Sequence, residues 1–230
     1  SLRVNNSNNS RSPFAVDKRT VEERLWTAVG KRNGFQQTKN ILEGMNKEQF
    51  LKAMWKDDEN GGSNDVKMNW GGGKNILHRA AWKGDIETVR LIIEVGNSFG
   101  LNLMDDISTG IGNYGKTPIF FAITQNRNDV VQMLLSLGAN ILIVNNKGQS
   151  AVSIAVSHLE QATLDEIFRI EEEQLDRGGE FINYRKTHSD GRRYGDLDPR
   201  FLDDKDDVNY DMDAFVEMES YRKAHGKESL

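Results

Sequence analysis

The stretch that decides the fold is GKTPIFFAITQNRNDVVQMLLSLGAN, which runs from Gly115 to Asn140. Thr117 followed by Pro118 is typical of a helix start, because proline at the first helical position gives up no hydrogen bond. Apolar residues then recur at helical spacing twice, in 119–123 and in 130–135, with polar residues between the two runs. A glycine follows the second run, where glycine commonly ends a helix. The stretch therefore predicts two short helices joined by a turn.

The same pattern recurs on both sides of this stretch. Residues 74–96 place Leu77 where the stretch has Ile119, and residues 148–174 place Val152 at the same point of the pattern. The step from Ile119 to Val152 is 33 residues, and the step from Leu77 to Ile119 is 42, so nine residues are inserted between the first two units. Repetition at a fixed period indicates an array of similar structural units.

In its motifs the chain resembles the ankyrin-repeat family. GKTPIFFA followed by DVVQMLLSLGAN is similar to the repeat of that family, and 33 residues is its period. The resemblance is clear at 74–96 and 115–140 and weaker at 148–168 and 21–45, and Asn75 stands where the family usually has threonine. It implies an all-α ankyrin-repeat solenoid of about four helix-turn-helix units, with irregular and partly helical N- and C-terminal extensions.

The chain divides around an ankyrin-repeat domain that we expect at 21–174. The predicted parts are a flexible leader at 1–20, a cap at 21–45, an extra helix at 46–56, repeats at 74–96, 115–140 and 148–174, and an acidic C-terminal extension at 175–230 with a helix near 213–225. Phe215, Met218 and Tyr221 form an apolar stripe on this last helix, and we expect them to anchor the extension either on the solenoid or on a partner. The missing first Met indicates a fragment or a processed form.

Composition excludes several classes of function. The 230 residues include no cysteine, which removes disulfides, thiolate catalysis and cysteine-based zinc sites. No apolar run approaches the ~18 residues of a membrane-spanning helix. With no signal-peptide pattern, we expect an intracellular location, in the cytoplasm or, after processing, in an organelle interior such as a stroma or matrix, and not secretion.

The net charge of −5 is unevenly distributed along the sequence. Residues 1–34 carry 7 basic and 3 acidic groups, a net charge of +4, whereas residues 165–230 carry 11 basic and 19 acidic groups, a net charge of −8. We interpret both as solvated termini. Basic residues near the N terminus could also neutralise phosphates, but the pI near 5.5 disfavours nucleic acid as the main partner.

Motifs that could carry chemistry are incomplete. Residues Gly110–Thr117 match the phosphate-binding pattern G-x-x-x-x-G-K-T, but Pro118 removes a backbone donor and no buried strand precedes the loop. The acidic run at 207–218 lacks the glycine and the final glutamate of a calcium loop. The four histidines form no catalytic set, and we interpret His78 as a structural hydrogen-bonding residue. The sequence therefore predicts no catalytic activity, cofactor or metal.

The resemblance places partner binding on the first helix of each unit and on the finger loops between units. Trp82 and Phe121 are the expected hot spots, because aromatic side chains dominate binding energy at protein interfaces. Leu142 and Val144 lie in a finger that is more apolar than usual, and they either contact a partner or pack against the enlarged preceding finger. The full predicted surface is Arg79, Trp82, Lys83, Phe121, Thr124, Gln125, Leu142 and Val144.

The function that follows from the resemblance is non-catalytic protein–protein recognition, as an adaptor or a subunit of a large assembly. The concave face and the fingers would bind a protein partner, and the tails would act as tethers. The alternatives are a regulatory or targeting domain of a larger enzyme, an RNA-bound subunit anchored by the basic N terminus, and a nucleotide-binding protein that uses Gly110–Thr117.

Overall fold

The computed structural model describes residues 17, 19–54, 74–108, 115–145 and 147–183. Within these residues four helical hairpins follow one another along the chain. They are α1 (Val21–Val29) with α2 (Phe35–Leu42), α4 (Ile76–Lys83) with α5 (Ile86–Ser98), α6 (Pro118–Ile123) with α7 (Asn128–Ser136), and α8 (Ala151–Ala155) with α9 (Gln161–Asp176). The predictions for the leader and for the helix near 213–225, with its anchors Phe215, Met218 and Tyr221, concern residues that lie outside the described ranges, except for 17, 19 and 20 of the leader.

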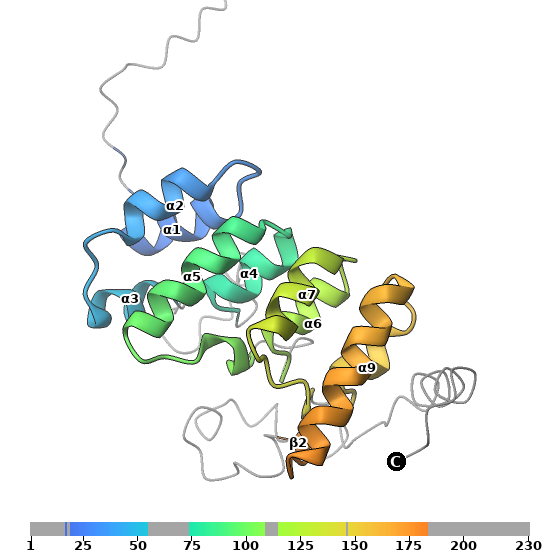
Figure 1. Ribbon diagram of the computed structural model, residues 1–230. Coiled ribbons are helices and arrows are strands. Elements are labelled where there is room, and N and C mark those ends of the chain that lie inside the picture. The colour runs from blue at the N-terminus through green and yellow to red at the C-terminus, as the bar shows by residue number, and fades with distance from the viewer. Residues whose placement is uncertain (1–16, 18, 55–73, 109–114, 146, 184–230) are drawn as a thin grey trace, which may run out of the picture.

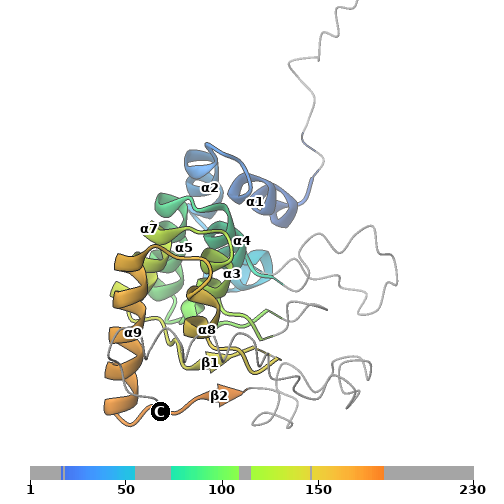
Figure 2. The same ribbon diagram turned by 90° about the vertical axis from the view of Figure 1, so that its right-hand side faces the viewer.

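The hairpins stack in sequence order from α1–α2 to α9, as the progression from blue to orange in Figure 1 shows. Their first helices, α1, α4, α6 and α8, pack on one another, and so do their second helices, α2, α5, α7 and α9. Figure 2 shows these two layers edge on. We call them the inner and the outer layer. The arrangement confirms the predicted all-α solenoid of helix-turn-helix units.

Helix ends follow local sequence signals. Thr117 is the N-cap of α6 and Pro118 is its first residue, as the sequence predicts. At α4, Asn75 replaces the usual threonine and still caps the helix, since its side chain accepts a hydrogen bond from the amide of His78. The same helix ends at Gly84, whose φ of 80° lies in the left-handed region.

The hydrophobic core runs continuously between the two layers. Every residue of α6 is buried, so this short helix is covered on all sides by its neighbours. At the N-terminal end, α3 (Lys47–Met54) packs on α1 and buries Phe50, whose ring lies 5.6 Å from the ring of Phe99 at the end of α5. Helix α3 thus extends the core beyond the four hairpins, because Phe50, Ala53 and Met54 belong to the same hydrophobic cluster.

The long finger after α5 packs against its own unit. The 3₁₀ turn η1 (Leu103–Asp105) buries Leu103, and Ile107 is buried a few residues further on. Leu103 lies directly on α5 because Gly96 has no side chain, and a Cβ there would come within 2.6 Å of Leu103 Cδ1. Leu103 and Ile107 are thus used inside the unit, and they need no partner to cover them.

The C-terminal end of the array is closed by a short parallel strand pair. Strand β2 (Ile182–Asn183) pairs with β1 (Ile143–Val144), with Ile182 opposite Ile143. Gln174 near the end of α9 fixes this region, because its Nε2 donates to the carbonyl of Ala139 at 2.8 Å and its Oε1 accepts from the amide of Ile141 at 3.1 Å. None of the helices in the described ranges has the length and apolarity needed to cross a membrane.

Candidate partner-binding surface

Trp82 and Lys83 form the C-terminal end of α4, where the inner layer is open. The side chain of Trp82 is 39% exposed, and Lys83 Nζ lies 4.8 Å from its ring centroid. The backbone is held from the next hairpin, because Arg127 Nε donates to the carbonyl of Trp82 at 3.5 Å. The indole is therefore presented on a fixed helix end, as a binding anchor requires.

Thr124 and Gln125 occupy the corresponding end of α6. Both side chains are partly exposed. Thr124 Oγ1 donates to the carbonyl of Phe121, and Gln125 Nε2 donates to the carbonyl of Thr124, each at 3.2 Å. Since α4 and α6 pack on each other, the two helix ends lie on neighbouring units of one surface. Trp82 supplies the apolar part of that surface, and Thr124 and Gln125 supply polar groups beside it.

Arg79 contributes to the inner layer nearer the N terminus. Its guanidinium carbon lies 4.5 Å from the ring centroid of Trp26 on α1, a cation–π geometry. Burial lowers the pKa of Arg79, and its Nε has no hydrogen-bond partner within the described residues. One face of the guanidinium lies on Trp26 and its tip lies against Gly30, and the side chain as a whole is partly exposed.

Phe121 is not a surface residue, and the prediction that it is exposed is wrong. The side chain is only 5% exposed, and its ring packs edge-on against His78 with the centroids 5.2 Å apart. The reason lies in the register of the units. Phe121 holds the position that Arg79 holds one unit earlier, and at this position each side chain packs on the first helix of the preceding unit. Phe121 therefore belongs to the core.

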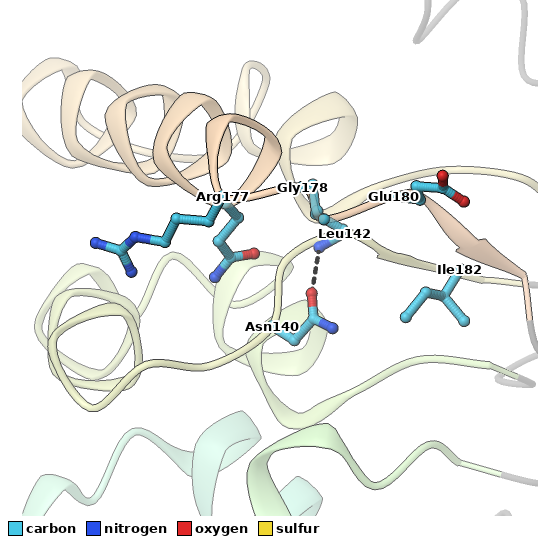
Figure 3. Close-up of a pocket in the computed structure, with 8 residues that line it drawn as sticks. Asn140, Leu142, Arg177, Gly178, Glu180 and Ile182 are labelled. Atoms are coloured by element: carbon cyan, nitrogen blue, oxygen red, sulfur yellow. Dashed lines mark hydrogen bonds between the residues drawn. The ribbon is translucent and has the colours of Figure 1, made fainter.

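The finger after Gly138 also differs from expectation. Leu142 is 2% exposed, and its side chain lies against the segment after α9, where a Cβ at Gly179 would come within 2.7 Å of Leu142 Cδ1. Its carbonyl accepts a hydrogen bond from the amide of Ile182 at 2.9 Å. Its amide donates to Asn140 Oδ1 at 3.0 Å, the dashed line in Figure 3. Val144 is partly exposed in β1. Of the two finger residues, only Val144 keeps a side chain that a partner could reach.

A shallow depression of about 340 Å³ lies where the end of α9 meets this finger (Figure 3). Its lining combines apolar, amide and charged groups from the finger and from 174–182, including Leu142, Gln174 and Arg177. Both polar atoms of the Gln174 side chain are hydrogen-bonded to the backbone, at Ala139 and Ile141. The depression is thus part of the C-terminal closure.

Lysines recur at the N-terminal ends of the inner helices, a feature that sequence reasoning overlooked. Lys74 and Lys116 each precede an N-cap residue, and Lys147 stands three residues before the N-cap Ser150. The pKa of Lys116 is lowered, first by burial and then by the charges of Lys147 and Lys74. The pKa of Lys74 is lowered by burial and by the charge of Arg79. The periodic lysines in the sequence were the available signal.

His78 has the structural role predicted for it. Its Nδ1 accepts from the amide of Asn75 at 3.0 Å, so the proton lies on Nε2, which is 2.9 Å from the carbonyl of Asp106. The side chain is fully buried, and this burial lowers its pKa to about 3. His78 is therefore neutral and ties the helix start to the finger. No group of three His, Asp or Glu side chains within the described ranges is arranged to hold a metal.

The residues that match the phosphate-binding pattern form hydrogen bonds within the finger. The amide of Gly115 donates to the carbonyl of Ser108 at 2.9 Å, and the amide of Lys116 donates to Ser108 Oγ at 3.3 Å. These amides close the base of the finger, whereas a nucleotide site would direct them at phosphates. The following helix α6 has only six residues, and Gly110 lies outside the described residues.

Comparison with known proteins identifies the class. A family model described as ankyrin repeats (3 copies) matches residues 43–145 and 77–169, which together span more than half of the chain. The chain therefore belongs to the ankyrin-repeat family, whose repeats are generally non-catalytic and imply protein partners.

The solved structures to which the chain is similar include that of the predatory endopeptidase Bd0816 of Bdellovibrio bacteriovorus in complex with the immunity protein Bd3460. The matched chain is 21% identical, and the match covers 67% of the present chain and 66% of that chain, with a TM-score of 0.43. The present chain thus spans slightly less than two thirds of the matched chain.

Proposed function

We propose that this protein is a non-catalytic protein–protein interaction module, an adaptor or a subunit of a larger assembly. Its partner would bind the ends of the inner helices and the fingers, through Arg79, Trp82, Lys83, Thr124, Gln125 and Val144. The single observation that carries the proposal is the 39% exposure of Trp82 on a helix end whose backbone is held by the neighbouring unit.

An exposed tryptophan on a rigid element favours protein binding for energetic reasons. Its ring loses little conformational freedom on binding, while burying it removes a large apolar area from water. Lys83 already lies against the ring, and a partner that covered both would shield a cation–π contact from solvent. Thr124 and Gln125 would supply the polar rim that surrounds such anchors in interfaces.

The described residues also support a non-catalytic role. Catalytic acids and bases need a pKa near the working pH and access to a substrate. His78 has neither, because it is fully buried and its pKa is lowered to about 3. A regulatory or targeting domain of a larger enzyme would use the same surface, so this alternative differs only in what lies beyond the chain. The hydrogen bonds of Gly115 and Lys116 disfavour the nucleotide alternative.

The test is a quantitative co-purification from native extract with the full chain as bait. Trp82→Ala is compared with Leu137→Ala, a matched control whose side chain is 40% exposed at the end of the outer helix α7. A hot-spot loss of about 2 kcal/mol corresponds to roughly thirtyfold weaker binding. We expect recovery of at least one partner to fall for Trp82→Ala and to persist for Leu137→Ala. Equal recovery of every protein by the two variants would remove the proposed surface.

A further inference from the structure

Four basic side chains form a row along the inner layer, which we call the basic row: Arg79, Lys74, Lys116 and Lys147. Arg79 stacks on Trp26, and Lys74 Nζ lies 5.3 Å from the ring centroid of Phe121. Lys116 is partly buried, and its neighbours along the row are Lys74 and Lys147. The row thus passes over three consecutive units of the array.

Acidic side chains are scarce on the inner helices next to the basic row. Helices α4, α6 and α8 carry no Asp or Glu. Asp106 lies at the base of the finger, but its carboxylate accepts a hydrogen bond from Asn75 Nδ2 at 3.1 Å. Within the part of the chain that the structure describes, no carboxylate forms an ion pair with Arg79, Lys74 or Lys147. Partly desolvated like charges disfavour one another, so an anionic group over the row would be stabilised.

The same sequence contains a segment of the opposite charge. Residues 196–219 hold ten Asp or Glu and two Lys or Arg, a net charge of −8 in 24 residues. No other segment of comparable length in the chain has so large a net charge. A polyanion of this density complements a row of four cations, and the pairing would be strongly dependent on salt.

The described chain ends close enough to the basic row for this segment to reach it. Strand β2 runs parallel to β1, with Asn183 opposite Val144, and Lys147 follows Val144 by three residues. The described chain therefore ends at Asn183, beside the finger that carries one end of the basic row. Residue 196 is 13 residues further on, which can span up to about 45 Å at ~3.5 Å per residue. Such a tether gives an effective concentration on the order of millimolar.

We propose that the acidic segment 196–219 binds along the basic row of its own chain and thereby occupies part of the inner layer. The contact is intramolecular and needs no external protein, so it goes beyond the proposed function. A partner that binds the inner layer would therefore have to displace the acidic segment. A second copy of the chain or an unrelated polyanion on the row would be a different occupant, and the experiment separates these.

The test uses the full chain, which contains no cysteine and so accepts a single label site. Ser220→Cys places a nitroxide next to the acidic segment, and amide signals are recorded by nuclear magnetic resonance. We expect the signals of Lys116 and Gln149 to be attenuated at about 50 mM salt and to recover at about 500 mM, where the Debye length falls to roughly 4 Å. The attenuation should not change on dilution, because the contact is within one molecule.

Two sets of variants control the result. Replacing Lys74, Lys116 and Lys147 by Gln should abolish the attenuation, and so should replacing Asp203, Asp204, Asp206 and Asp207 by Asn, which leaves the described residues untouched. The matched control replaces Lys31, Lys39 and Lys47 by Gln, away from the row, and should retain it. Absence of attenuation, its loss on dilution, or equal attenuation in both lysine variants would overturn the proposal. None of these readouts depends on whether Trp82 binds a partner.

Discussion

Acidification to pH 5 should destabilise this protein through His78. The imidazole is fully buried between the N-cap residue of α4 and the finger, where Nδ1 accepts from Asn75 and Nε2 lies 2.9 Å from the carbonyl of Asp106. Burial lowers its pKa from 6.5 to about 3. Protonation would give Nδ1 a hydrogen that faces another donor, which is a second reason for the neutral form.

The sign and size of the effect follow from proton linkage. Between pH 6.5 and 3 the unfolded chain binds a proton at His78 that the folded chain does not bind. The stability contributed by His78 is therefore fully present above pH 6.5 and declines as the pH falls below that value. The decline is about 1.4 kcal/mol per pH unit, or about 2 kcal/mol between pH 6.5 and 5.

The assay is urea unfolding, followed by circular dichroism, at several pH values between 5 and 7. Wild type should lose free energy of unfolding across this range, whereas His78→Leu should be less stable at pH 7 and nearly independent of pH down to 5. His158→Gln changes an exposed histidine and should retain the wild-type slope. An unchanged slope in His78→Leu would refute the assignment of the pH dependence to this buried imidazole.

Two further predictions concern residues whose places the structure revised or explained. Phe121→Ala should lower the free energy of unfolding by about 3–5 kcal/mol, because it removes a buried aromatic ring. Thr124→Ala should change the free energy of unfolding by about 0.5 kcal/mol or less. Similar values for the two variants in urea unfolding would contradict the core position of Phe121. Gln174→Leu should lower the free energy of unfolding by about 2 kcal/mol, because it leaves the Ile141 amide and the Ala139 carbonyl without their partner. Hydrogen exchange at the amides of Ile141 and Ile182 should become faster. Unchanged exchange at Ile141 would show that Gln174 does not hold the strand pair in place.

The helical units were predictable because their signals are local. Pro118 at the first helical position and the apolar spacing after it depend on neighbours within one or two turns. The extra helix α3 was equally visible, since Asn46 and Gln49 form the reciprocal side-chain bonds expected at a helix start. Such features need no knowledge of how the units pack together.

The misplaced residues depend on contacts between units. Phe121 resembles a surface residue if α6 is considered alone, but it packs on His78 of the preceding unit, 43 positions earlier in the sequence. Leu142 is covered because a strand of two residues adds to its finger, and a strand this short leaves no periodic pattern. The sequence shows that the lysines of the basic row recur, but only the stacking of the units brings their charges together.

The pairing of the inner helices has a consequence for how such a chain can evolve. Arg79 meets Trp26 and Phe121 meets His78, so these two boundaries between units have different combinations of side chains. A recombination that exchanged the second and third units would separate Phe121 from His78 and leave Trp26 without its cation. Although the units share one backbone pattern, their order is specified by these pairs, and we expect shuffled or duplicated arrays to lose stability at each mismatched boundary.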